Sequence, residues 1–84
     1  MIITEDDLPE GAAYFPGYES AIIGVTDDDR VAYDYHSLCL AEMANAGCTY
    51  EEAEEWVQFN TLRSIPYMGS QSPVVIYRFE EDQE

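Results

Sequence analysis

Residues 49–64 read TYEEAEEWVQFNTLRS, and this stretch decides the fold predicted for the chain. It opens with a capping box, in which the hydroxyl of Thr49 meets the amide three residues on and the carboxylate of Glu52 reaches back. Apolar side chains then recur at the spacing of one helix face: Ala53, Trp56 and Val57. The stretch therefore predicts a helix from Thr49 to about Ser64, with Trp56 in the core.

A shorter helix is predicted immediately before it, over residues 37–46. Asp34 or Ser37 can cap its start, and Gly47 stands where a left-handed residue commonly ends a helix. The face expected to be buried is a stripe of small and apolar side chains: Cys39, Leu40, Met43 and Ala44. Two helices joined by a short turn are thus expected.

Three strand candidates flank the helices. Residues 21–26 form an apolar run and residues 30–35 alternate, with the acidic turn 27–29 between them, which is the pattern of a hairpin. Residues 74–79 follow Pro73 and form the third strand. The order β-β-α-α-β predicts an α+β fold, a three-stranded antiparallel sheet with two helices on one face.

The length of 84 residues allows one domain. We expect the α+β domain over residues 20–79, between an acidic, irregular arm of residues 1–19 and an acidic tail of residues 80–84. The N-terminus lacks the regions of a signal peptide, and no apolar stretch approaches the length of a membrane span. The expected compartment is the cytoplasm, that of the host cell if a phage encodes the chain.

Charge is the strongest compositional feature. Eighteen acids oppose three arginines, lysine is absent, and the formal net charge is −15. Small soluble domains usually carry a net charge of magnitude roughly 2–8, and a larger one destabilises the folded state by self-repulsion. Direct binding to nucleic acid or to an anionic membrane is therefore disfavoured. The charge leaves three explanations open: a basic protein surface as partner, a cation, or a saline environment.

Two acidic clusters are the candidate partner-binding sites: Asp27, Asp28 and Asp29 in the turn, and Glu51, Glu52, Glu54 and Glu55 in the helix. Carboxylates three or four helical positions apart lie about 5–6 Å from each other, a spacing comparable to that of phosphates along a nucleic-acid strand. Tyr67, in a predicted loop, adds contact area, as do Tyr14 and Tyr18. Each cluster taken alone also has a structural explanation, as a turn or as a helix N-terminus.

Metal and catalytic sites are not predicted, and no cofactor is expected. The turn 27–29 lacks the alternating pattern of a calcium loop. His36, Cys39 and Cys48 are too few for a structural zinc site, which takes four ligands. Catalysis by Cys39 with His36 and Asp34 is disfavoured, because an acidic surrounding weakens a thiolate nucleophile.

Trp56, Asn60 and Arg63 recur along one side of the long predicted helix. They could form a recognition strip. The structural interpretation is preferred: Trp56 in the core, Asn60 bonded to the backbone, and Arg63 favoured by the helix C-terminus or paired with a nearby acid.

The segment from Asp34 to Tyr77 carries a composite motif. Its parts are Tyr33-Asp34-Tyr35, Glu51-Glu52-Ala53, Glu55-Trp56-Val57, Asn60-Thr61, Arg63, Ile65-Pro66-Tyr67 and Pro73-Val74-Val75-Ile76-Tyr77. The motif covers roughly half of the chain and resembles a group of small, acidic, uncharacterised proteins of bacteria and their phages. Size and acidity are also similar to those of phage anti-CRISPR proteins and other DNA mimics. That second likeness implies a basic protein groove as the partner.

The leading hypothesis is an acidic inhibitor, encoded by a phage or mobile element, that occupies the basic nucleic-acid groove of a host protein. It requires the carboxylates to gather into one continuous negative surface. The alternative is a structural or regulatory module that self-associates, for instance by pairing an exposed sheet edge. We expect a monomer or a weak homodimer, and an enzyme is the least favoured class.

Overall fold

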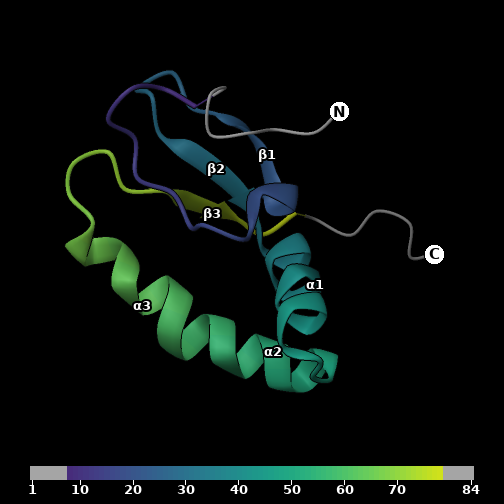
Figure 1. The fold of residues 1–84 in the computed structure, drawn as a ribbon. Coiled ribbons are helices and arrows are strands. Elements are labelled where there is room, and N and C mark those ends of the chain that lie inside the picture. The colour runs from purple at the N-terminus through teal and green to yellow at the C-terminus, as the bar shows by residue number, and fades with distance from the viewer. Residues whose placement is uncertain (1–7, 79–84) are drawn as a thin grey trace.

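The computed structural model describes residues 8–78, which form an α+β fold. The sheet has three strands in the order β1-β2-β3: β1 (Ile22–Val25), β2 (Val31–Asp34) and β3 (Val74–Ile76). The helices are α1 (Tyr35–Ala46), α2 (Tyr50–Trp56) and α3 (Leu62–Ser64). A π-helical turn, Val57–Thr61, joins α2 to α3, so residues 50–64 form one continuous helical segment, called here the long helix (Figure 1). Single 3₁₀ turns lie before β1 (Glu19–Ala21) and after α3 (Ile65–Tyr67).

The sheet is mixed, and the predicted all-antiparallel arrangement is wrong. β1 pairs antiparallel with β2, but β3 runs parallel to β2. The cause is the length of the helical crossover: α1 leaves the C-terminal end of β2, and the long helix returns to the other end of the sheet (Figure 1). At about 1.5 Å per residue the long helix exceeds the length of a four-residue strand. The chain therefore re-enters the sheet where β2 begins, and β3 must follow the direction of β2.

The predicted helix boundaries are close to the observed ones, because their caps are local. Asp34 is the N-cap of α1, and its carboxylate accepts a hydrogen bond from the Ser37 amide at 3.0 Å. Gly47 ends α1 in the left-handed conformation, with φ 69°, and its amide donates to the Met43 carbonyl. The capping box of α2 is confirmed, with Thr49 and Glu52 bonded reciprocally at 3.0 and 3.2 Å.

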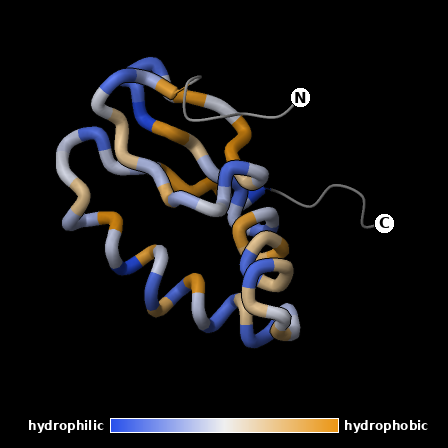
Figure 2. The backbone as a smooth tube through the Cα atoms, in the orientation of Figure 1, coloured by the Kyte–Doolittle hydropathy of each residue, from blue (hydrophilic) through white to orange (hydrophobic). Residues whose placement is uncertain are grey.

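The core lies on the face of the sheet that carries Ile22 and Tyr33, which stand opposite each other on β1 and β2. Leu38 of α1 and Val57 of the long helix join the same buried cluster. In Figure 2 the long helix alternates between hydrophobic and hydrophilic residues within each turn, as expected of a helix with one buried side.

The buried face of α1 differs from the prediction. Leu40 is 46% exposed, whereas the buried residues of the helix are Tyr35, Leu38, Cys39, Ala41 and Glu42. Glu42, a charged residue outside the predicted apolar stripe, is part of the buried face. Its partner is Tyr18, whose hydroxyl donates to the Glu42 carboxylate and satisfies it inside the protein.

The segment before the sheet, residues 8–18, has no helix or strand but packs on the core. The rings of Phe15 and Tyr33 lie 5.0 Å apart, and the Phe15 amide donates to the Tyr33 hydroxyl at 2.8 Å. Tyr14 and Tyr18 are half-buried against the same cluster. Residues 1–7 of the predicted arm, the predicted tail and Phe79 of the predicted third strand lie outside the described residues. Within residues 8–78, the helices are too short or too polar to cross a lipid bilayer.

Candidate functional site

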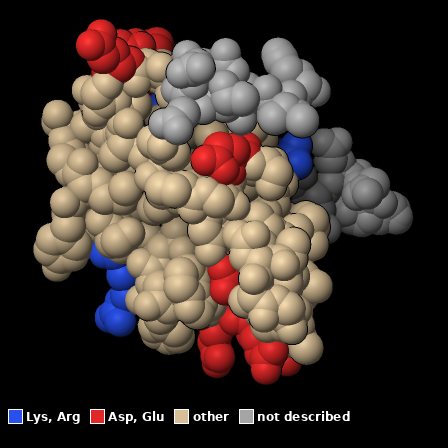
Figure 3. Space-filling model, viewed as in Figure 1, with Lys and Arg blue, Asp and Glu red and all other residues tan. Residues whose placement is uncertain are grey.

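The two acidic clusters occupy opposite ends of the molecule. Asp27, Asp28 and Asp29 form the tip of the β1–β2 hairpin, where Thr26 bonds Asp28 and Asp29 has φ 65°. The glutamates of α2 lie at the start of the long helix, far from that tip (Figure 1). Figure 3 shows acidic side chains in separate groups, at the top, in the middle and at the bottom of the view, with uncharged surface between them. On this face, the expected continuous negative surface is therefore not formed.

The four glutamates of α2 have different surroundings. Glu52 is held by the capping box, and Glu54 is half-buried, with its carboxylate accepting from the Tyr35 hydroxyl at 3.4 Å. Glu51 and Glu55 are exposed. These last two are thus the α2 carboxylates most accessible to a partner.

The three arginines leave these carboxylates uncompensated. Arg78 pairs with Asp34, which is the one ion pair formed among residues 8–78. Arg30 donates to the Ser72 carbonyl at 2.8 Å and to its hydroxyl at 3.3 Å. The guanidinium of Arg63 lies 5.6 Å from the centre of the Phe59 ring. Arg63 therefore contacts an aromatic ring and not the acid that was one of its predicted partners.

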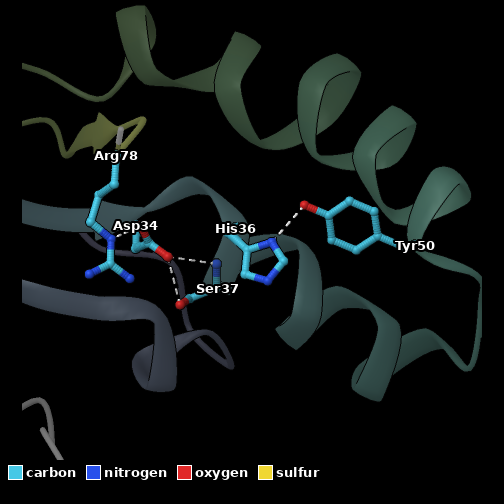
Figure 4. Close-up of polar contacts among 5 residues, drawn as sticks. All are labelled: Asp34, His36, Ser37, Tyr50 and Arg78. Atoms are coloured by element: carbon cyan, nitrogen blue, oxygen red, sulfur yellow. Dashed lines mark hydrogen bonds and ion pairs between the residues drawn. The ribbon is translucent and has the colours of Figure 1, made fainter. Parts of the chain in front are cut away.

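Asp34 is the most constrained acid of the fold (Figure 4). It is 1% exposed, and it accepts from the amide and hydroxyl of Ser37 and from Nε of Arg78 at 2.8–3.0 Å. Burial alone would raise the pKa of Asp34, but the hydrogen bonds from Ser37 and Arg78 outweigh it and hold that pKa below its ordinary value. This carboxylate caps α1 and joins β2 to the residues after β3, which is a structural role.

The polar groups around Cys39 do not form a nucleophile and base. His36 pairs through Nδ1 with the Tyr50 hydroxyl at 2.9 Å (Figure 4). Cys39 is fully buried next to Tyr35 and Tyr50, and burial raises the pKa of its thiol. Cys48 is half-buried and, like Cys39, is a free thiol. Among residues 8–78, the His, Cys, Asp and Glu side chains do not gather into threes that could hold a metal ion.

The long helix carries an exposed aromatic surface, which the preferred structural interpretation of its residues did not predict. Trp56 is 44% exposed and Phe59 is 59% exposed, so the prediction of Trp56 as a core residue is wrong. The buried residues are Ala53, Val57 and Thr61, and Trp56 precedes Val57 by one position, which turns it away from the core. The predicted bond of Asn60 is confirmed, since its amide donates to the Trp56 carbonyl at 3.1 Å. Trp56, Phe59 and Arg63 are spaced i, i+3 and i+7, and this spacing in the sequence could have indicated that they share one side of the helix.

Tyr67 lies just beyond the C-terminal end of the long helix and is 89% exposed. The long helix separates it from the glutamates at the start of α2, so it does not share their local surface (Figure 1). Of the three tyrosines predicted to contact a partner, Tyr67 is the accessible one, whereas Tyr14 and Tyr18 are half-buried.

No protein-family model, curated protein or solved structure matches the chain. The resemblance to uncharacterised bacterial and phage proteins therefore stays a prediction.

Proposed function

We propose that this chain is an acidic protein-binding domain that occupies the basic, nucleic-acid-binding groove of another protein and so inhibits it. The observation that carries the proposal is the lack of compensating cations. Eighteen acids face three arginines, and among residues 8–78 only Arg78 is used in an ion pair. Such a charge excess costs stability by self-repulsion, and a basic partner relieves it.

Because the acidic clusters do not join into one surface on the face shown in Figure 3, the contact surface that we assign to this function is a local one, the start of the long helix. Glu51 and Glu55 are exposed one helical turn apart, and Glu54 lies beside them. The positive end of the helix dipole favours carboxylates there. The partner's Lys and Arg side chains would meet these carboxylates in place of phosphates. The hairpin aspartates, at the other end, contribute to the long-range attraction that raises the association rate.

A phage or another mobile element is the source that fits such an inhibitor, and the cytoplasm of the host cell is its place of action. The proposal excludes direct binding of nucleic acid by this chain, because nucleic-acid binding requires Lys and Arg to neutralise phosphates. It also assigns no catalytic step to the chain. Inhibition would follow from occupancy of the groove alone.

The test is capture of a partner by the immobilised chain from a host lysate, with washes at about 0.1 M and about 1 M salt. A partner of the proposed kind binds at the lower salt and is released at the higher, since screening removes the attraction. Double-stranded DNA of arbitrary sequence should release the captured partner from the immobilised chain, because both bind the same groove. A partner retained equally at both salt concentrations, or one that binds DNA and this chain together, would contradict the proposal.

A further inference from the structure

The outer side of the long helix carries an ordered stripe of three exposed residues, Glu55, Phe59 and Arg63. In a regular α-helix, residues four apart drift around the axis because a turn holds 3.6 residues. The π-helical turn Val57–Thr61 bonds five residues apart and so takes in one more residue. Residues four apart therefore stay on one side of the long helix. The contact of Arg63 with the Phe59 ring is consistent with this alignment.

The same alignment holds on the inner side. Ala53, Val57 and Thr61 are also four apart, and all three are buried. Glu55, Phe59 and Arg63 each stand two positions further along the chain, which is about 200° around an α-helix. The stripe therefore faces almost directly away from the core. Trp56 lies along its flank and widens the apolar part.

The stripe is self-complementary in charge. Its order along the helix is acid, aromatic ring, base. When two such helices lie antiparallel about Phe59, the Glu55 of each copy comes opposite Arg63 of the other, and the two Phe59 rings meet on the axis. A two-fold axis of this kind makes each contact twice. Arg63 has no acidic partner within residues 8–78, so its guanidinium is available for this pairing.

We propose that the stripe Glu55–Phe59–Arg63, flanked by Trp56, is a homodimer interface in which the long helices of two copies pack antiparallel. The occupant of this exposed face is a second copy of the chain. One helix pair buries less area than the roughly 1,200 Å² of a stable standard interface. The dimer is therefore weak, with a Kd between about 1 µM and about 1 mM. It uses a helix face and not the sheet edge named in the alternative hypothesis.

Analytical ultracentrifugation of the full chain, from about 10 µM to about 1 mM at moderate salt, tests the proposal. A monomer–dimer equilibrium is expected. Phe59→Ala should raise Kd at least about fivefold, because it removes the ring at the centre of the interface. Leu40→Ala, at an exposed apolar residue on α1, is the matched control and should leave Kd unchanged. A chain that stays monomeric throughout overturns the proposal, as does equal weakening by the two variants.

Charge reversal tests the geometry. Glu55→Arg and Arg63→Glu should each weaken the dimer by about tenfold, since each places like charges opposite each other twice. The double variant Glu55→Arg/Arg63→Glu should restore it. A mixture of the two single variants should form a heterodimer, because each then supplies the charges that the other needs. Circular dichroism checks that the variants fold, and a mixture without heterodimers overturns the antiparallel pairing.

Salt distinguishes this inference from the proposed function. Two copies of formal charge −15 repel each other over long range. Screening reduces that repulsion, so the dimer should become tighter as salt rises, while the difference between the charge variants shrinks. Binding to a basic partner should weaken over the same range. Either result can fail without the other, and a dimer that dissociates as salt rises overturns the inference.

Discussion

Nε of Arg78 lies 2.8 Å from Oδ1 of Asp34, and this ion pair connects the end of β2 to the residues that follow β3. The two partners are unlike in environment, since Asp34 is almost fully buried and Arg78 is largely exposed. Asp34 also caps α1 through Ser37. A single carboxylate thus holds two strands and a helix together, and the stability of the fold should depend on its charge.

Replacement of Asp34 by Asn tests that dependence. Asn keeps the capping geometry but loses the charge, so we expect the free energy of unfolding at pH 7 to fall by about 1–3 kcal/mol. The folded-state pKa of Asp34 is lowered, so its contribution is present above the unfolded pKa of about 4 and is lost as pH falls through the folded pKa. Urea denaturation between about pH 2 and pH 7 should therefore show a flatter acid limb in Asp34→Asn.

The control for this variant is Arg78→Gln. Arg78→Gln leaves the buried Asp34 carboxylate with its Ser37 bonds, so its cost should be smaller than that of Asp34→Asn. If both variants lowered the free energy of unfolding by similar amounts, the ion pair would be the main contribution of Asp34 to stability, and its hydrogen bonds with Ser37 would be secondary.

The parts of the fold that the sequence predicted depend on neighbours along the chain. The Thr49–Glu52 capping box and the Gly47 helix end each involve residues within a few positions, so local propensity and hydrogen bonding determine them. The direction of β3 depends instead on where the long helix delivers the chain. The position where the long helix ends is determined by how whole helices and strands pack. The hydrophobic periodicity of the sequence contains no information about that packing.

The errors at the candidate site have equally specific causes. Burial of Glu42 depends on Tyr18, which is distant in sequence. Exposure of Trp56 follows from burial of Ala53 and Val57 on the other side of the same helix, and periodicity alone did not indicate which side would be buried. The acidic clusters could be identified from the sequence. Their positions at opposite ends of the molecule depend on the fold.

The bond between Tyr18 and Glu42 gives a second test of stability. Tyr18→Phe leaves a buried carboxylate without its donor, so the free energy of unfolding should fall by about 1–3 kcal/mol. Glu42→Gln keeps an acceptor for Tyr18 and should cost less. A double-mutant cycle of Tyr18→Phe with Glu42→Ala, which removes the acceptor, should give a coupling energy of at least about 0.5 kcal/mol. Additive effects would mean that the contact contributes nothing specific.

Alkaline pH should destabilise the protein through its buried and half-buried phenols. Desolvation by burial is the largest cause that raises the pKa of four tyrosines to about 12: Tyr18, Tyr33, Tyr35 and Tyr50. In the unfolded chain they ionise near pH 10, so the unfolded state binds fewer protons between about pH 10 and pH 12. Their contribution is complete below pH 10 and is lost as pH rises toward 12. Absorbance near 295 nm with urea denaturation follows both events, and Tyr18→Phe should show a shallower loss.

The two acidic ends should differ in their effect on a basic partner. Glu51→Gln/Glu54→Gln and Asp27→Asn/Asp29→Asn each remove two charges, and both spare Asp28, which bonds Thr26, and Glu55. Asn tolerates the left-handed backbone found at position 29, so the hairpin should keep its shape. If the start of the long helix is the contact surface, the α2 variant should weaken binding of the captured partner by about three- to tenfold at low salt. The hairpin variant should reduce mainly the association rate. Isothermal titration and stopped-flow mixing separate the two effects, and equal losses would show that total charge, and not a defined surface, holds the partner.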